Sequence, residues 1–325
     1  MREPLFNTLP RPQPAALAGK RVLVLGAGDS GLSAAQWVAH EGGTVRVADT
    51  RAAPPRAPDL GRAELVTGAF RNSLLKDVDL VCISPGIALA EPLVREAVAR
   101  AIPVVGDVEL FAWAVRGRFA AKVIAVTGTN GKTTVAALTG HLLRAAGVDC
   151  EVAGNIGPAA LGALLRRLAA PPAAWVLELS SYQLETTWAL EPDAATMLNL
   201  SEDHLDRYAG LAEYAAAKAR VFLGAGTQVL NRCDAASMAL ALSGRVQVTF
   251  GLDAPPVAED FGLLAAQGRS WLACGAERIL AADELPIFGR HNASNALAAC
   301  ALAHLAGAPL AALAGGLRTF RGLPH

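Results

Sequence analysis

Residues 123–134 have the sequence VIAVTGTNGKTT, and this stretch decides how the middle of the chain folds. The apolar run at 123–126 predicts a short buried strand, and the pattern at 133–146 predicts a helix. The glycines between them allow a tight turn and a close approach to a ligand. Such a turn presents backbone N–H groups at the start of a helix, where anions bind. The sequence therefore predicts a phosphate-binding loop.

We assign this loop to ATP. Lys132 would neutralise the β and γ phosphate oxygens, and the Thr133 hydroxyl would bind Mg²⁺. The loop departs from the eight-residue P-loop pattern, because Val126 stands where the first glycine is expected. The alternative is a turn with a surface lysine, but lysine is rare in this chain, where arginine is the usual basic residue. The predicted ATP-binding residues of the loop are Gly128, Thr129, Asn130, Gly131, Lys132, Thr133 and Thr134.

A second glycine-rich loop, GAGDSG at residues 26–31, follows an apolar run and precedes a helical pattern at 30–40. Asp49 ends the next apolar run. This arrangement is typical of dinucleotide-binding units, in which the acid binds a ribose hydroxyl. The alternative is that the glycines only allow the helix to pack closely on the strand. A nucleotide function is favoured, without deciding which nucleotide.

Strand and helix patterns alternate along both halves of the chain, which predicts parallel sheets with helices on their faces. The predicted fold class is α/β. Residues 1–116 are expected to form a Rossmann-like domain, and residues 117–325 a P-loop-type central ATPase domain with a mostly parallel sheet. Further strand candidates lie at 78–83, 103–105, 174–179, 194–198, 228–230 and 246–250.

Composition excludes several classes of function. The 325 residues are 53% hydrophobic and 18% charged, which is typical of a globular protein. Equal numbers of basic and acidic residues, 29 of each, give no net field to attract nucleic acid or an anionic membrane. The five cysteines are scattered, as in a reducing compartment, and there is no signal-peptide pattern at the start. We expect a cytoplasmic monomer that binds neither nucleic acid nor membrane.

Glu178 ends an apolar run, so it should lie at the carboxyl end of a strand near the phosphate-binding loop. A carboxylate there suits Mg²⁺, which prefers oxygen ligands. The alternative is a glutamate that caps a helix or forms a salt bridge. His204 follows another strand candidate, and Lys218 lies in the helical stretch 214–222. On sequence alone, both would be surface residues.

Several stretches, together with the loop at 128–134, resemble the Mur ligases, ATP-dependent amide ligases that build the stem peptide of peptidoglycan. The family uses the shortened loop, so the valine at position 126 fits. The resemblance runs from about Gly19 to His325, and the motifs are highly specific together. They are SPGIA (84–88), GDVELF (106–111), GNIG (154–157), LELSSYQLE (177–185), EDHLDRY (202–208) and HNASNA (291–296).

The resemblance implies a reaction and its substrates. It predicts ATP-dependent ligation of D-glutamate to UDP-N-acetylmuramoyl-L-alanine through an acyl phosphate, in peptidoglycan precursor synthesis and hence in cell-wall biogenesis, cell shape and cell division. The first domain would then hold the UDP part of the substrate instead of a dinucleotide. The residues implied for this contact are Ser30, Asp49, Thr50, Arg51, Ser84 and Gly86.

The resemblance also implies two Mg²⁺ ions, the first held by Thr133 and Glu178. The second would be held by His204 and by Lys218 once CO₂ has carbamylated it, which requires a neutral amine and so a lowered pKa. Lys132 completes the implied catalytic set. Asn155 and Gln183 match positions that handle the muramoyl-alanine part. Asn292 and Asn295 match the region near adenine, although a helix N-cap explains Asn292 equally well.

Of three other interpretations, the first and the third stay open. A nicotinamide-dependent oxidoreductase fits the first loop and Asp49 but gives the second loop no task. A GTP switch is suggested by Asn231-Arg232-Cys233-Asp234, which mimics a guanine-binding motif, but arginine replaces its lysine and we regard the match as fortuitous. The third is a fragment that binds without turnover. Members of the family have a C-terminal amino-acid-binding domain that we expect to be absent from this chain, so poor ligation is predicted.

Overall fold

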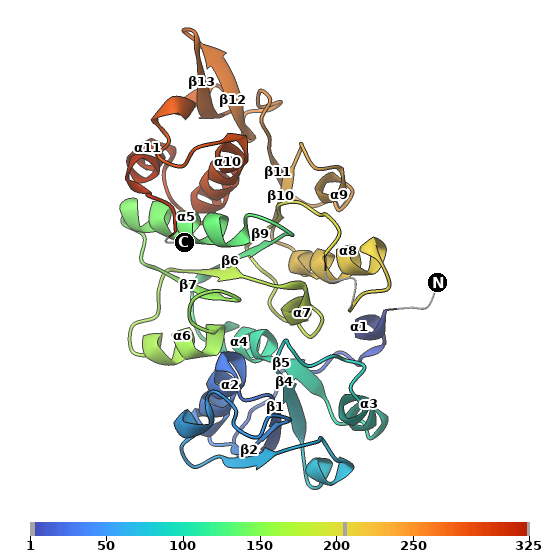
Figure 1. Cartoon of the computed structure of the whole chain (residues 1–325). Helices are drawn as coiled ribbons and strands as arrows, with labels where there is room; N and C mark the ends of the chain where they lie inside the picture. The colour runs from blue at the N-terminus through green and yellow to red at the C-terminus, as the bar shows by residue number, and fades with distance from the viewer. Residues whose placement is uncertain (1–3, 204–206, 324–325) are drawn as a thin grey trace. The chain divides into compact units, whose positions relative to one another are not determined.

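The computed structural model describes residues 4–203 and 207–323, and contacts between residues divide it into two units. The first unit consists of Met1–Phe119 and of two later segments of the chain, Gly157–Pro171 and Ser181–Leu190. The second consists of Ala120–Ile156, Pro172–Ser180 and Glu191–His325. Each unit is built around its own sheet (Figure 1).

The first unit has a five-stranded parallel sheet in the order β3-β2-β1-β4-β5. The chain leaves β1 toward β2 on one side and reaches β4 on the other, so the strand order reverses beside β1. Ligands of such sheets bind at the carboxyl ends of the strands where this reversal occurs. The helices and strands are α1 (Leu5–Thr8), β1 (Arg21–Leu25), α2 (Asp29–His40), β2 (Thr44–Asp49), β3 (Glu64–Thr67), β4 (Leu80–Ile83), α3 (Pro92–Ala99), β5 (Val104–Gly106), α4 (Asp107–Val115), α6 (Ala160–Arg167) and α7 (Ser181–Leu184), with 3₁₀ turns at Ala57–Asp59 and Asn72–Leu75.

The second unit has a nine-stranded sheet in the order β14-β13-β12-β11-β10-β9-β6-β8-β7. It is parallel from β7 to β12, which confirms the predicted α/β class with a mostly parallel sheet. Its elements are β6 (Lys122–Thr127), α5 (Lys132–Ala145), β7 (Cys150–Gly154), β8 (Ala174–Glu178), β9 (Ala194–Met197), α8 (Leu211–Ala219), β10 (Thr227–Asn231), α9 (Ala235–Met238), β11 (Gln247–Phe250), β12 (Phe261–Ala266), β13 (Arg269–Cys274), β14 (Glu277–Ala281), α10 (Arg290–Leu305) and α11 (Leu310–Thr319), with 3₁₀ turns at Arg220–Phe222 and Ala282–Glu284.

The antiparallel strands β12, β13 and β14 were not among the sequence predictions. β12 and β13 pair antiparallel up to Ala266 and Arg269, so the turn between them has two residues. These are Gln267 and Gly268, both with positive φ, at 56° and 72°. Such turns usually contain Asn-Gly or Asp-Gly, and glutamine at the first position hides the signal.

Helices α5, α10 and α11 pack against one another beside the second sheet (Figure 1). The alanine-rich middle of α10, from Ala296 to Ala303, is completely buried. Small side chains let this helix lie close to its neighbours, as expected for a buried helix. Within residues 4–203 and 207–323, no helix combines the length and apolar character needed to cross a bilayer.

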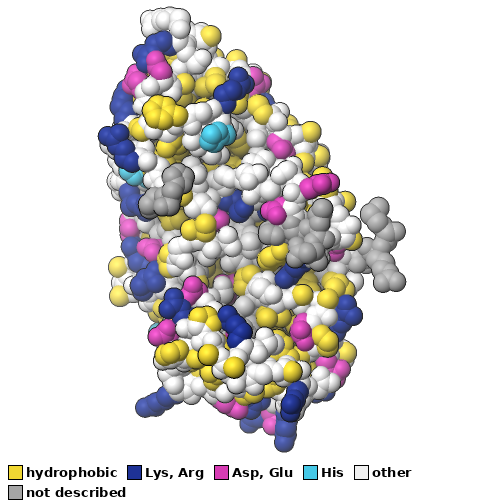
Figure 2. Space-filling model, viewed as in Figure 1, with side chains coloured by type: hydrophobic (Ala, Val, Ile, Leu, Met, Phe, Trp, Pro, Cys, Tyr) yellow, Lys and Arg dark blue, Asp and Glu magenta, His cyan; other side chains and the backbone are white. Residues whose placement is uncertain are grey.

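Surface charge is mixed. On the face shown in Figure 2, lysine and arginine side chains alternate with aspartate and glutamate, in keeping with the balanced composition. Any strong attraction for phosphate must therefore come from a local arrangement of groups.

Candidate active site

Four neighbouring strands of the second sheet, in the order β9-β6-β8-β7, end at the same edge because they are parallel. The phosphate-binding loop follows β6, and Glu178 is the last residue of β8. Asn155 directly follows β7. The topology therefore brings together residues that are far apart in the sequence.

The loop ends at Gly131, which precedes the first residue of α5 and has a φ of 83°, in the left-handed region that favours glycine. A Cβ at this position would lie 2.6 Å from the side-chain oxygen of Asn295 on α10. The amide N–H groups of the first turn of α5 have no partner within the helix. This is the local geometry that the predicted anion site requires.

Lys132 begins α5 and is half-buried. Its Nζ donates a hydrogen bond to the carbonyl oxygen of Thr129, 2.9 Å away. Burial lowers the pKa of Lys132, and the nearby carboxylates of Glu178 and Asp203 oppose that shift. The ammonium thus lies within electrostatic reach of the buried Glu178.

Glu178 is 1% exposed and pairs with Val126 of β6 across the sheet. Asn155 Nδ2 donates to its Oε1 over 3.1 Å, and Asn155 N donates to its carbonyl oxygen over 2.8 Å. A Cβ at Gly154 would lie 2.2 Å from that carbonyl, so only glycine allows this close approach. A carboxylate accepts up to about four hydrogen bonds, so the Asn155 amide leaves Glu178 with free acceptor capacity.

Lys218, on α8, is 1% exposed, so the surface position favoured by sequence alone is wrong. Its Nζ donates to the carbonyl oxygen of Gly128 over 2.7 Å and lies 4.7 Å from the ring centre of Tyr214. Burial, reinforced by the charge of Lys132, lowers the pKa of Lys218 to about 7, while nearby carboxylates oppose the shift. A neutral amine is therefore accessible near neutral pH.

The donor set fits a hard divalent cation with few protein ligands. Among residues 4–203 and 207–323, no three histidine, cysteine, aspartate or glutamate side chains form a metal-binding group. Mg²⁺ commonly takes one or two protein carboxylates and completes its shell with water and phosphate oxygens. Glu178 and Thr133 would supply a carboxylate and a hydroxyl to such an ion. His204, predicted as a ligand of the second ion, lies outside the described residues.

A pocket of about 890 Å³ lies beside the loop. Asn292 Nδ2 donates to the carbonyl oxygen of Phe288 over 2.8 Å, and Asn295 Nδ2 donates to Asn292 Oδ1 over 3.4 Å. The N-cap of α10 is Gly289, so the N-cap explanation of Asn292 is wrong. The lining residues are Asn130, Gly131, Thr133, Thr134, Asn199, Ile287, Phe288, His291, Asn292, Ser294, Asn295, Arg321, Gly322 and Leu323.

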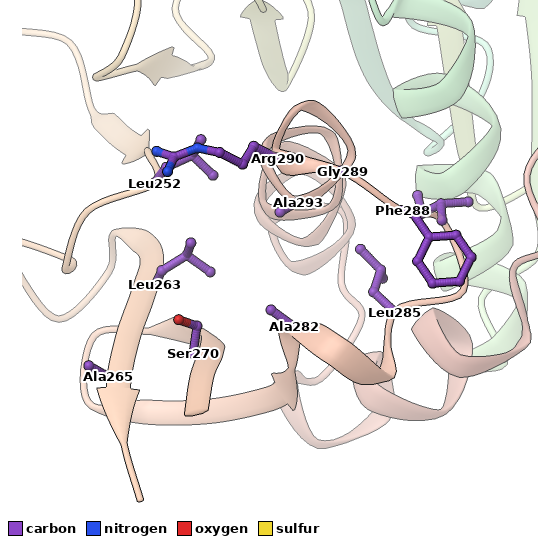
Figure 3. Close-up of a pocket in the computed structure, with 11 residues that line it drawn as sticks. Leu252, Leu263, Ala265, Ser270, Ala282, Leu285, Phe288, Gly289, Arg290 and Ala293 are labelled. Atoms are coloured by element: carbon purple, nitrogen blue, oxygen red, sulfur yellow. The ribbon is translucent and has the colours of Figure 1, made fainter. Parts of the chain in front are cut away.

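Among the lining residues of this pocket that sequence reasoning missed, two are informative. Phe288 is 84% exposed, which is unusual for a phenylalanine, and it borders the pocket that contains the loop. Asn199 follows β9, the strand beside β6, and its position just after an apolar run could have identified it. A neighbouring pocket of about 490 Å³, lined mostly by apolar residues including Leu252, Leu263 and Leu285, contains none of the predicted site residues (Figure 3).

The first unit brings the other glycine-rich loop together with Asp49 and Ser84, because β2, β1 and β4 are neighbours whose carboxyl ends share one edge. Asp49 accepts hydrogen bonds from the backbone N–H of Ala27 over 2.7 Å and from Arg51 Nε over 2.8 Å. The Arg51 side chain is the main cause that lowers the pKa of Asp49 to about 2. Ser84 Oγ donates to the carbonyl oxygen of Gly26 over 3.3 Å.

The remaining predicted residues differ in their surroundings. The Ser30 side chain is hydrogen-bonded to the buried Asp107, whose pKa burial raises. Thr50 and Gly86 are exposed, beside the end of β2 and of β4. Gln183 is buried on α7 and belongs to the first unit, whereas Asn155 belongs to the second.

Known proteins similar to this chain agree with the geometry. The profile of the Mur ligase middle domain matches residues 126–303, and that of the Mur ligase MurD-like N-terminal domain matches residues 20–106. The UDP-N-acetylmuramoylalanine–D-glutamate ligase of Nitrosospira multiformis is 55% identical over 319 residues, with 95% of this chain and 67% of that protein covered. The ligase of the same name from Aromatoleum aromaticum is 52% identical over 324 residues, covering 96% and 69%.

Solved structures support the fold. The UDP-N-acetylmuramate:L-alanyl-γ-D-glutamyl-meso-diaminopimelate ligase of Neisseria meningitides is similar with a TM-score of 0.65 and 20% identity, covering 95% of this chain and 100% of that one. The UDP-N-acetylmuramate–alanine ligase of Thermotoga maritima has a TM-score of 0.59 and 22% identity, covering 93% and 69%. The loop, the sheet topology and the two profiles lead to one conclusion, that this chain belongs to the Mur ligase family.

Proposed function

We propose that this chain is the substrate- and ATP-binding part of a cytoplasmic ligase that adds D-glutamate to UDP-N-acetylmuramoyl-L-alanine in peptidoglycan precursor synthesis. The observation that carries the proposal is the gathering of Lys132, Glu178 and Lys218 beside a phosphate-binding loop in a chain 55% identical to such ligases. ATP and Mg²⁺ belong to the family's reaction.

The chemistry explains why the site needs cations around a loop of N–H groups. The substrate carboxylate attacks the γ-phosphorus of ATP, ADP leaves, and an acyl phosphate forms. The amine of D-glutamate then attacks the acyl carbon, and the tetrahedral intermediate expels phosphate. Two anions must approach in the first step. Lys132 and the N–H groups at the start of α5 offset their repulsion.

Thr133 and Glu178 would hold one Mg²⁺, and His204 with carbamylated Lys218 would hold a second. Metal ions at such a site neutralise charge that develops on the transferred phosphoryl group. Carbamylation requires an unprotonated amine, and a pKa of about 7 for Lys218 supports that requirement. Asn155 would both orient Glu178 and meet the muramoyl-alanine part, with Gln183.

In residues 1–116, the UDP part would lie at the carboxyl edge of the parallel sheet, against Ser30, Thr50, Ser84 and Gly86. Asp49 is occupied by Arg51, whose side chain is half-exposed. We propose that Asp49 orients Arg51, and that the guanidinium meets the anionic part of the nucleotide. In residues 117–325, Asn292 and Asn295 would lie near adenine. We propose a monomer that binds no nucleic acid.

The chain spans about two thirds of the length of its relatives. We therefore test the proposal first by ligand binding, which does not require the whole ligase. Calorimetric titration should show binding of UDP-N-acetylmuramoyl-L-alanine, and NADH is the control ligand for a dinucleotide site. Binding of NADH without binding of the UDP-sugar would refute it. Phosphate release on adding D-glutamate and ATP reports ligation.

Glu178→Gln tests the metal assignment. The substitution keeps the size of the side chain and removes its charge, so it should weaken the Mg²⁺-dependent part of ATP binding at least tenfold and leave UDP-sugar affinity unchanged. The matched control is Glu277→Gln, at an exposed position of β14. Equal Mg²⁺ dependence in wild type and Glu178→Gln would show that Glu178 holds no metal.

A further inference from the structure

The turn at residues 231–234 resembles a guanine-binding motif in sequence. Its polar side chains form hydrogen bonds to other parts of the protein. Asn231 Nδ2 donates to the carbonyl oxygen of Leu198 over 2.8 Å, and its Oδ1 accepts from Cys233 N over 2.9 Å. Asp234 caps α9, accepting from Ser237 N over 2.7 Å, and also accepts from Leu200 N over 3.3 Å. The turn therefore holds the segment 198–200, which follows β9.

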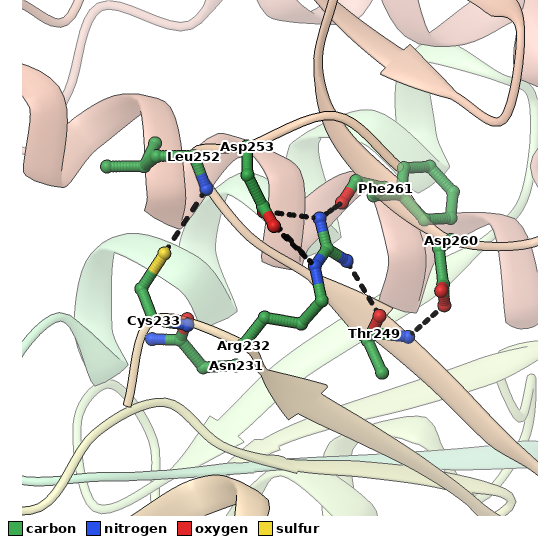
Figure 4. Close-up of polar contacts among 8 residues, drawn as sticks. All are labelled: Asn231, Arg232, Cys233, Thr249, Leu252, Asp253, Asp260 and Phe261. Carbon is green, nitrogen blue, oxygen red and sulfur yellow. Dashed lines mark hydrogen bonds and ion pairs between the residues drawn. The ribbon is translucent and has the colours of Figure 1, made fainter. Parts of the chain in front are cut away.

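Arg232 fastens the same turn to the next strands (Figure 4). Its guanidinium donates to Asp253 Oδ1 over 2.7 Å and to Thr249 Oγ1 over 2.6 Å. It also donates to the carbonyl oxygen of Phe261 over 3.0 Å. The arginine that replaces the lysine of a guanine-binding motif thus anchors the turn to β11 and β12.

The segment that the turn holds supports the phosphate-binding loop. The side-chain amide of Asn199 forms two hydrogen bonds with the backbone of Asn130. Its Oδ1 accepts from Asn130 N over 2.8 Å, and its Nδ2 donates to the Asn130 carbonyl oxygen over 3.0 Å. The backbone carbonyl of Asn199 accepts from Thr129 N over 3.0 Å, and Thr129 Oγ1 accepts from Ser201 N over 3.0 Å. Residue 199 therefore pairs with two consecutive residues of the loop.

This pairing decides which part of the loop is left for phosphate. The N–H groups of Thr129 and Asn130 are occupied by Asn199, so the groups that face an anion are those from Gly131 into the first turn of α5. Because its hydrogen bonds to Asn199 already order the loop, binding of a ligand to the open N–H groups loses less conformational entropy.

We propose that Asn199 is a positioning residue for nucleotide binding, held in place by Asn231 and Asp234. The inference rests on the proposed ATP-dependent function. It predicts that removing the hydrogen bonds between Asn199 and the loop, or those between the turn and the segment 198–200, weakens nucleotide binding. UDP-sugar binding by the first unit should not change.

The test compares wild type with four variants of the full chain, namely two single variants, their double variant and a control, by titration with Mg²⁺·ATP and with UDP-N-acetylmuramoyl-L-alanine. Asn199→Ala removes both side-chain bonds to the loop. Asn231→Asp keeps the acceptor for Cys233 N but loses the donor to Leu198. Each should weaken ATP binding about tenfold, the effect of losing one or two hydrogen bonds, and leave UDP-sugar affinity unchanged. The control is Asn72→Ala, an exposed asparagine of the first unit.

The double variant distinguishes positioning from direct contact, because Asn199 lines the pocket beside the loop. If Asn231 acts through Asn199, the two losses are not additive, and the double variant binds ATP about as weakly as Asn199→Ala. Full additivity, or an unchanged ATP affinity for Asn231→Asp, would overturn the inference. So would equal losses for ATP and UDP-sugar with a lowered melting temperature, which indicate general destabilisation. If the wild type does not bind ATP, the proposed function itself fails.

Discussion

The buried amine of Lys218 should make the free energy of unfolding depend on pH above neutral pH, and replacing Lys218 with methionine should remove that dependence. The buried amine has a pKa of about 7 in the folded protein, against a usual value of 10.5. Between these values the unfolded chain carries a proton that the folded protein has released. The free energy of unfolding therefore rises with pH in this interval, by up to about 1.4 kcal/mol for each pH unit.

The total effect follows from the same two values. The fall from 10.5 to about 7 corresponds to about 5 kcal/mol as an upper bound, all of it unfavourable below pH 7, where both states are protonated. Methionine fills a similar volume without the charge, and it forfeits the hydrogen bond to Gly128, worth about 1 kcal/mol. Lys218→Met should therefore be more stable than wild type at pH 6. Its advantage should shrink by about 2 to 3 kcal/mol between pH 7 and pH 9.

Urea unfolding of both proteins at pH 6, 7, 8 and 9, in buffers freed of CO₂, measures this difference. Removing CO₂ keeps the amine unmodified. Lys76→Met, at an exposed position, is the matched control and should follow the wild type at every pH. A constant difference between wild type and Lys218→Met from pH 6 to pH 9 would refute the reasoning, because a buried amine with a lowered pKa cannot behave in that way.

Two further substitutions test the glycine-rich loops. Asp49→Asn should cost about 2 kcal/mol at pH 7, because it removes charge-assisted hydrogen bonds to Arg51 and Ala27. Since the folded pKa is lowered from 3.8 to about 2, the stability that Asp49 contributes is present above pH 4 and lost as the pH falls toward 2; an unchanged difference from wild type at pH 2 would contradict this. Gly131→Ala, at a φ of 83°, should cost about 1 to 2 kcal/mol and also weaken ATP binding. Gly117→Ala, at a φ of 73° and facing open space, should cost about 1 kcal/mol by thermal unfolding, because it lacks the close contact with Asn295, and should leave ATP affinity intact.

The local features of the site could be predicted from the sequence. The run at 123–134 predicts strand, turn and helix because glycine conformation and apolar periodicity act over a few residues. Glu178 was located at the end of a strand by the apolar residues before it. β8 then proved to be a direct neighbour of β6. The family resemblance, carried by short motifs, was confirmed by the two Mur ligase profiles that match the chain.

Other features could not be predicted from the sequence, because they depend on packing between distant segments. The pattern around Lys218 is that of an exposed helix, yet α8 lies so that the amine is buried under Gly128. The return of 157–171 and 181–190 to the first unit has no local signal. Nor does the hairpin that extends the second sheet, since its turn lacks the usual asparagine.

The sequence by itself determined the strand, turn and helix at 123–134, the alternation of strands and helices and the membership of the Mur ligase family, because these follow from residues close together in the chain. Only the tertiary structure decided that Asn199 bonds to Asn130, that Asn231 and Asp234 bond to the residues on either side of Asn199, and that burial lowers the pKa of the Lys218 amine to about 7. The order of the strands brings Asn199 beside Asn130 and beside the turn at 231–234. Exclusion of water lowers the pKa of Lys218. Neither is written in any one stretch of the chain.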